Sequence, residues 1–219
     1  MNKDKFEEFE EFAYKTVQVG DNAQAVTGHR GTAVAGYNGT ATAGPSGVAR
    51  AGTNGVVNVG IDGVAVAGYQ GTAEAGDFGT AVSGDHGIAV AGYKGTATAG
   101  DYGAKATAGD WGTARTGDEG TAVAGYHGTA VAGEYGKATV GNYGIAMAGR
   151  YGCASAGDNG IAMVGIHGCA SAGRNGVIQI WYFDGHEMKI EIGRIGEDGL
   201  EPNTMYEVVL APKRFTKVI

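Results

Sequence analysis

Residues that could bind a metal or act as nucleophiles are scattered along this sequence. None of the five histidines has another ligand at the short spacing typical of a zinc site. These histidines are His29, His86, His127, His167 and His186. The chain contains no phosphate-binding, dinucleotide-binding or serine-nucleophile motif. The sequence therefore predicts no catalytic residue, no metal and no cofactor, and we expect a protein that is not an enzyme.

Two cysteines, Cys153 and Cys169, are the remaining candidates for covalent chemistry. Two thiols do not suggest the disulfide framework of a small secreted domain. The N-terminal residues, Met1 to Tyr14, are acidic and lack the apolar core of a secretory signal. No later stretch is long and apolar enough to span a membrane. We therefore expect a cytoplasmic protein of a bacterial-type cell, with both thiols free.

Composition narrows the possible partners. The formal net charge of −7 argues against non-specific binding to nucleic acid or to an anionic membrane, because both need clustered lysine and arginine. The 43 glycines among 219 residues are about three times the usual share. Glycine at that level is typical of disorder, of collagen or of a tight repeat, and its spacing decides among them.

From His29 to Gly173 the chain consists of eight-residue units of the form x-x-G-[TVI]-A-x-A-G, such as Tyr69 to Gly76 (YQGTAEAG). The span holds eighteen units and one extra residue, which lies within 101–109 and which we expect to form a β-bulge. Collagen is excluded because the glycine intervals alternate between three and five. A helix is excluded because two glycines per unit would cost it about 2 kcal/mol. Disorder is excluded because four positions in every unit are restricted.

Each unit predicts a strand followed by a turn. The stretch T-A-x-A forms a strand whose second and fourth residues, nearly always alanine, point inward, while the first and third point outward. The third position accepts Arg50, Glu74 and Arg115, which could not be buried in so thin a body. The stretch G-x-x-G forms a turn, in which we expect glycine to supply the positive φ.

Two units form one coil, because two features recur at sixteen residues and not at eight. The triplet Ile145-Ala146-Met147 recurs at 161–163, and Cys153-Ala154-Ser155 recurs at 169–171. The predicted fold is therefore an all-β, two-sided β-solenoid (a β-helix) of about nine 16-residue coils with an alanine-rich core. At the usual spacing between strands, the rod is about 43 Å long.

Assigning alternate units to opposite sheets gives the solenoid two outward faces. The first face is the more apolar, and exposed apolar area of that extent usually marks an interface. We predict that a second copy of the chain or another partner covers it, although valine and threonine are also simply good strand residues. The predicted interface residues are Val34, Val66, Val82, Val131, Ile145, Met147, Ile161 and Met163.

Larger side chains gather in the turns and suggest a second, partner-binding surface. Stacked acids could bind cations, but their spacing differs from that of the calcium-binding nonapeptide, and aspartate is a natural turn residue, so we expect solvated turns. The stacked aromatic residues could bind carbohydrate or protein, or could only cover the turn backbone. The candidate residues are Asp85, Asp101, Asp118, Glu134, Tyr102, Tyr135 and Tyr151 on one edge, and Trp111, between Phe78 and Tyr143, on the other.

The two ends of a solenoid need caps, because an open strand edge would pair with another chain. Phenylalanines among glutamates from Phe6 to Phe12 predict a short amphipathic helix within an N-terminal cap at 1–20. Strand-like runs around Asp184-Gly185, followed by a strand-forming tail, predict a small C-terminal β module at 177–219. The solenoid is expected to occupy 21–176.

The unit A-G-Y-x-G-T-A-T-A-G, as in Ala91 to Gly100, resembles the repeat of bacterial ice-nucleation proteins. More of the chain is similar to uncharacterised, mostly phage-encoded octapeptide-repeat proteins with G-x-x-[GS]-T-A-x-A units. Those proteins end in a short module that resembles Gly199 to Phe215 (GLEPNTMYEVVLAPKRF). The resemblance implies a β-solenoid and brings no established activity. Ice binding would need a regular Thr-x-Thr array, which valine, arginine and methionine interrupt on this chain.

These observations predict a non-enzymatic, phage-encoded interaction protein that presents an oligomeric β-solenoid surface to a host macromolecule, such as a defence factor that it inhibits. The alternatives are a structural fibre or adhesin, a nucleic-acid-mimicking decoy and an ice-binding protein. Co-purification with virions, salt-dependent competition with DNA and shaping of ice crystals would distinguish them. The expected partners are the chain itself and an unidentified protein, and neither nucleic acid nor a membrane is expected.

Overall fold

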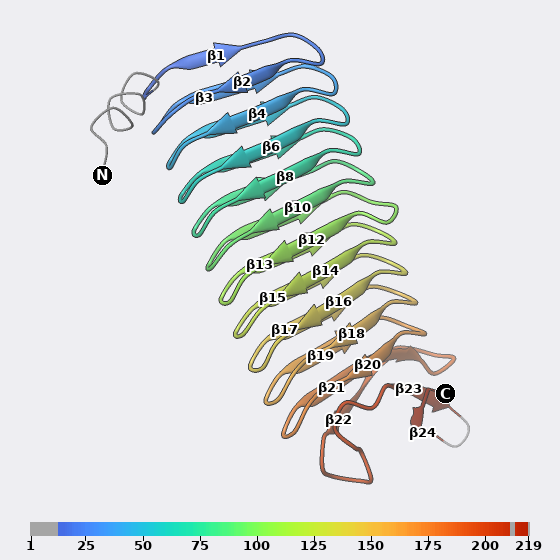
Figure 1. The fold of residues 1–219 in the computed structure, drawn as a ribbon. Coiled ribbons are helices and arrows are strands. Elements are labelled where there is room, and N and C mark those ends of the chain that lie inside the picture. The colour runs from blue at the N-terminus through green and yellow to red at the C-terminus, as the bar shows by residue number, and fades with distance from the viewer. Residues whose placement is uncertain (1–12, 211–212, 219) are drawn as a thin grey trace.

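The chain forms a β-solenoid, drawn as a ribbon in Figure 1. The computed structural model describes residues 13–210 and 213–218. Every regular element in these two ranges is a strand, and no helix there could cross a membrane. The strands belong to two sheets of 12 strands each.

The first sheet contains, in spatial order, β1 (Thr16–Gln18), β3 (Thr32–Ala35), β5 (Val48–Ala51), β7 (Val64–Ala67), β9 (Thr80–Val82), β11 (Thr96–Ala99), β13 (Thr113–Thr116), β15 (Thr129–Ala132), β17 (Ile145–Ala148), β19 (Ile161–Val164), β21 (Val177–Phe183) and β22 (Met188–Arg194). The second contains β2 (Gln24–Val26), β4 (Thr40–Ala43), β6 (Val56–Val59), β8 (Thr72–Ala75), β10 (Ile88–Ala91), β12 (Lys105–Ala108), β14 (Thr121–Ala124), β16 (Lys137–Val140), β18 (Cys153–Ser155), β20 (Cys169–Ser171), β23 (Tyr206–Leu210) and β24 (Lys213–Lys217).

From β1 to β21, successive strands alternate between the two sheets, so each coil contributes one strand to each sheet. In this part of the chain, neighbouring strands of a sheet are parallel and usually sixteen residues apart, with Thr32 opposite Val48 and Ala33 opposite Ala49. The predicted two-sided solenoid with sixteen-residue coils is therefore confirmed. Strands β1 to β20 make about ten coils where the repeat predicted nine, because β1 and β2 precede the first recognisable unit.

The core between the sheets is built almost entirely from alanine methyl groups. From β2 to β21 the second residue of every strand is completely buried, and most of the fourth residues are buried as well. Such small side chains let the two sheets approach closely, so the interior is filled without large residues. Larger side chains enter it at Val57, Val59, Val140 and Val164, and at Ile178 and Ile180 of β21.

Glycines begin and end the turns because neighbouring coils approach closely there. At Gly149, an added Cβ would lie 2.7 Å from the carbonyl carbon of Gly133 and 2.8 Å from the nitrogen of Glu134, both on the preceding coil. At Gly152, it would lie 2.8 Å from the Cβ of Ala148. Neither position has room for a side chain.

In the turns that begin and end with glycine, the positive φ falls on the residue before the second glycine, so the prediction that glycine supplies it is wrong. Gly103 is an exception, since it has a positive φ in addition to Tyr102 before it. Asn38, Lys94 and Tyr143, for example, have φ values of 50°, 53° and 59°. This backbone costs most residues about 1–2 kcal/mol. Hydrogen bonds between coils offset the cost, as where the Asn38 N–H donates to the carbonyl of Thr53 at 3.0 Å.

The extra residue within 101–109 lies in a turn and not in a strand, so the predicted β-bulge is wrong. Strand β12 keeps full register with both neighbours, with Lys105 opposite Ile88. Buried Ala104 takes the place of the second glycine, and Gly103 is the additional turn residue, with a φ of 77°. A turn at the edge can lengthen without breaking strand pairing, whereas a bulge would disrupt the ladder.

Two hairpins follow the last coil, and each continues one sheet. Strand β21 runs parallel to β19 and pairs antiparallel with β22. Strand β23 joins β20 through the antiparallel pair of Tyr206 with Ala170, and β24 pairs with β23. The C-terminal β module therefore extends the solenoid sheets themselves, and the hairpins lie beside its last coil in Figure 1.

Asp184 holds the turn between β21 and β22. Its Oδ1 accepts the main-chain N–H groups of His186 and Glu187, both at 2.9 Å, and its Oδ2 pairs with the Lys189 ammonium. Lys189, followed by these two N–H groups, holds the pKa of Asp184 well below its ordinary value. The contribution of Asp184 to stability is therefore present above the ordinary aspartate pKa and is lost as the pH falls through the lowered one.

The predicted N-terminal helix at Phe6 to Phe12 lies outside the described residues. In the described part of the predicted cap at 1–20, β1 is present and no helix is seen. Strand β1 runs parallel to β3, with Thr16 opposite Thr32. The strands of the solenoid therefore begin before residue 21.

Candidate interaction surfaces

The outward residues of the first sheet form the first face of the solenoid. The strand register aligns the third residues of these strands in one column, in which Met147 pairs with Met163. The first residues of the strands form a second column, in which Ile145 pairs with Ile161. All the predicted interface residues lie in these two columns, and each is half-buried or exposed. The remaining members are Val34, Val66, Val82 and Val131.

The apolar character of the first face is strongest near its C-terminal end. Ile145, Met147, Ile161 and Met163 lie on the neighbouring strands β17 and β19. Trp181 of β21 follows them and is 40% exposed. A shallow groove runs between the two methionines and Trp181. We call these five residues the methionine patch.

Trp181 was missing from the predicted interface because the eight-residue repeat stops near Gly176. The alternation of Val177–Phe183 was the available signal. Val177 lies opposite Ile161 on the first face, so every second residue after it also points outward. Trp181 falls on the first face for that reason.

Two arginines interrupt the first face. Arg50 lies between Val34 and Val66, and Arg115 pairs with Val131; both arginine side chains are exposed. Between β3 and β19, the outward columns of this face contain no aspartate or glutamate. The face is therefore apolar with two positive charges and no negative charge of its own.

The second face is more polar, and it carries both cysteines. Its third-residue column includes Ser155 and Ser171, whose hydroxyls are hydrogen-bonded at 3.0 Å. Beside them, Cys153 of β18 pairs with Cys169 of β20, and the two residues form a disulfide across 4.7 Å between Cα atoms. The expectation of free thiols is therefore wrong. The parallel register places the two Cβ atoms side by side, which is the geometry that a disulfide needs.

The acidic residues on the first edge, where the chain passes from the first sheet to the second, have a structural role. Oδ1 of Asp85 accepts the main-chain N–H of Asp101 at 3.0 Å, Asp101 accepts that of Asp118 at 2.9 Å, and Asp118 accepts that of Glu134 at 2.8 Å. Each carboxylate thus ties its coil to the next one. This ladder explains the stacked acids without a bound cation.

Replacing Asp118 with alanine is expected to lower the free energy of unfolding by about 1 kcal/mol, because the Glu134 N–H loses its acceptor. Asp118→Asn should lower it by only roughly 0.3 kcal/mol, since the amide oxygen of asparagine can still accept the Glu134 N–H. Asn142 shows this in the native chain, where it accepts the Asp158 N–H at 2.8 Å. Urea unfolding followed by circular dichroism measures both changes. An equal loss in the two variants would show that charge, and not the hydrogen bond, matters.

Aromatic rings stack along both edges. On the second edge, the His127 ring lies 4.1 Å from that of Trp111 and 5.0 Å from that of Tyr143, nearly parallel to both. On the first edge, Tyr135 and Tyr151 stack at 4.9 Å. Within each stack the rings cover one another's faces, so a ring face without a stacked neighbour occurs only at the ends of a stack. A surface that binds sugars or bases by stacking needs open ring faces, which disfavours that use.

Tyr102 belongs to a separate, shorter stack. Its ring lies 5.9 Å from that of His86, and Glu119 occupies the next coil at the same place in the turn. The predicted tyrosines of the first edge are therefore divided between two groups, with Tyr135 and Tyr151 on the far side of Glu119.

No group of three or more metal-binding side chains occurs within the described part of the chain. Comparison with known proteins adds no further information, because no family model, no curated protein and no solved structure matches this chain. The functional argument therefore depends on the chemistry of the surfaces.

Proposed function

We propose that this chain is a non-enzymatic interaction protein that self-associates through the methionine patch and presents the rest of its rigid solenoid to a partner. The observation that carries the proposal is the patch itself, five large apolar side chains on adjoining strands. Contiguous apolar surface of this kind marks interfaces in soluble proteins. Methionine suits such contacts because its unbranched side chain adapts to the opposite surface.

Self-association through the whole first face is disfavoured by its charges. In a two-fold dimer the same surface is contributed by both copies. Arg50 and Arg115 of each copy would then be buried against a face without carboxylates, and an unpaired buried charge is strongly destabilising. A contact limited to the methionine patch avoids this cost.

The remainder of the first face suits an acidic partner. Arg50 and Arg115 lie four strands apart, which corresponds to about 19 Å at the usual strand spacing. A partner that covers this surface would have to place a carboxylate opposite each arginine. Because the chain resembles phage-encoded repeat proteins, we propose a host macromolecule as that partner, and inhibition of a host factor such as a defence protein as the result.

The alternatives receive less support. A nucleic-acid-mimicking decoy would present dense negative charge, whereas the first face between β3 and β19 carries two arginines and no carboxylate. Ice binding would need regular threonine columns, and the first face contains valine, arginine and methionine in its third-residue column.

Light scattering tests the proposed self-association. We expect the wild-type chain to have the mass of a dimer or larger oligomer, and Met147→Lys/Met163→Lys to have the mass of a monomer, because two buried lysines would be unpaired. Two control pairs also replace third residues of neighbouring strands, sixteen positions apart. Val66→Lys/Val82→Lys lies on the first face outside the patch, and Thr107→Lys/Val123→Lys lies on the second face.

Both control pairs should remain oligomeric, with circular dichroism confirming that every variant is folded. A monomeric wild type would contradict self-association. Dissociation of Val66→Lys/Val82→Lys to the same extent would show that the whole first face is the contact.

A further inference from the structure

The main-chain groups of each first-edge turn are normally paired with the following coil. The N–H of the residue before the second glycine donates forward to a carbonyl, as from Glu119 to Glu134 at 2.8 Å and from Tyr151 to Ile166 at 3.0 Å. The carbonyl of the second glycine accepts the first N–H of the next strand, as where Lys137 donates to Gly120 at 2.8 Å. These two bonds extend the contact between coils around the edge.

The last turn of the first edge, Gly165–Gly168, lacks this continuation. Strand β21 does not turn after four residues, as the strands before it do, but runs straight on to Phe183. Among the described residues, neither the N–H of His167 nor the carbonyl of Gly168 has a main-chain partner. The next turn of the solenoid is therefore missing at this corner, although the rest of the coil is covered by the two hairpins.

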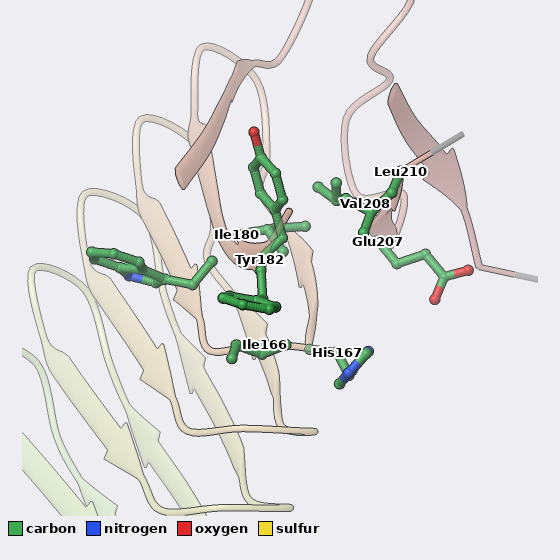
Figure 2. A pocket seen from close by; sticks show the side chains of 10 residues that line it. Ile166, His167, Ile180, Tyr182, Glu207, Val208 and Leu210 are labelled. Atoms are coloured by element: carbon green, nitrogen blue, oxygen red, sulfur yellow. The ribbon is translucent and has the colours of Figure 1, made fainter. Parts of the chain in front are cut away.

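A pocket of about 340 Å³ occupies the place of the missing turn. Figure 2 shows Val208 and Leu210 of β23 facing Ile180 and Tyr182 of β21, with His167 at the rim. Its volume falls at the lower end of the range for ligand sites. The walls combine apolar side chains with that of Glu207, which is exposed, while the floor carries the open backbone edge of the last turn.

We propose that this pocket binds an extended peptide segment of a partner protein, which takes the place of the missing turn and inserts an apolar side chain between β21 and β23. The pocket lies where the next first-edge turn would pack, so a segment bound there would continue the contact that is repeated between coils along the rod. The segment would accept a hydrogen bond from the His167 N–H and donate one to the Gly168 carbonyl. Main-chain pairing of this kind gives affinity, and the apolar pocket gives specificity.

This occupant fits the corner better than a second copy of the folded chain does. The internal turns of a folded solenoid are already bonded to their neighbours, so only the first coil of a second copy, at the opposite end of its rod, could offer such groups. An unfolded or extended segment retains a free carbonyl for the His167 N–H and a free N–H for the Gly168 carbonyl. The site goes beyond the self-association proposed above and lies at the end of the rod.

The solenoid's own sequence supplies a probe for this site. A fluorescein-labelled peptide TAVAGEYGKA copies residues 129–138, which include a complete first-edge turn. Its glutamate carbonyl and lysine N–H correspond to the groups of Glu134 and Lys137 that bond to the coil before them. A scrambled peptide of the same composition is the control for non-specific attraction.

We expect saturable binding of the probe in fluorescence anisotropy and weaker binding of the scrambled peptide. Leu210→Asp should weaken binding at least about tenfold, because a charge replaces an apolar wall at the rim of the pocket. Ile192→Asp is the matched control, since both aliphatic side chains are about half exposed, at 49% and 56%, and Ile192 does not line this pocket. It should leave the affinity unchanged.

The absence of probe binding, equal binding of the scrambled peptide, or unchanged binding by Leu210→Asp would each overturn the proposal. Light scattering on Leu210→Asp separates this site from the methionine patch. If the oligomer is unchanged while peptide binding is lost, the two sites are distinct. If the variant dissociates, the pocket belongs to the self-association contact and the peptide proposal is rejected.

Discussion

Gly149→Ala is expected to lower the free energy of unfolding by about 2–4 kcal/mol, because steric clash inside a packed structure is among the most costly effects of a single substitution. The added Cβ would lie 2.7 Å from the carbonyl carbon of Gly133 and 2.8 Å from the nitrogen of Glu134. Both atoms belong to the main chain of the preceding coil, so no side-chain rotation relieves the contact. Urea unfolding followed by circular dichroism gives the change in midpoint and slope.

Gly103→Asn is the control for this experiment. Gly103 has a φ of 77°, but nothing lies within 4 Å of an added Cβ there. Asparagine tolerates the left-handed region better than most residues, and it already occupies that region at Asn38. We expect a loss of at most about 1 kcal/mol. If both substitutions cost the same, the conformation of glycine and not the closeness of the coils would determine the repeat.

Reduction of the disulfide is expected to destabilise the protein by about 3 kcal/mol, the value for a closed loop of this length. Cys153 and Cys169 are sixteen residues apart on neighbouring coils. In Cys153→Thr/Cys169→Thr, threonine takes the place that it has in half of the other units, and a reductant should then have no effect. Thermal unfolding with and without dithiothreitol measures the difference. Equal sensitivity of the two proteins to reductant would contradict the prediction.

Titration of thiols in the untreated protein tests the bond directly. We expect no reactive thiol before reduction and two after it. Disulfides persist in oxidising compartments and are rare in the cytoplasm. Two reactive thiols in protein prepared without reductant would contradict the disulfide.

The repeat by itself determined the solenoid and the sorting of its side chains. A strand turns alternate residues to opposite faces, so the alanine columns had to point inward once Arg50 and Glu74 occupied the column between them. The sixteen-residue recurrence of Ile145 and Cys153 then assigned each unit to a sheet. These conclusions depend only on local geometry and on the cost of burying charge, both of which are visible in a single unit.

The details of the turns were decided by contacts between coils. A sequence shows that glycine is required but does not show whether φ or space requires it. Here the main chain of the preceding coil excludes a side chain at Gly149, while Tyr143 and similar residues take the positive φ. The role of the first-edge aspartates was also decided by contacts between coils. The main-chain N–H groups that they accept lie a full coil further along the chain.

The C-terminal end was decided by tertiary structure most of all. The sequence predicted a hairpin around Asp184-Gly185, but no repeat remained there to show how the hairpin meets the last coil. Because β21 continues straight instead of turning, Trp181 joins the first face, and no described residue closes the corner above His167. The sequence alone therefore determined the rod and which side chains lie on each of its two faces. Only the packing of the tail against the last coil determined the pocket, since that packing joins segments that share no periodic pattern.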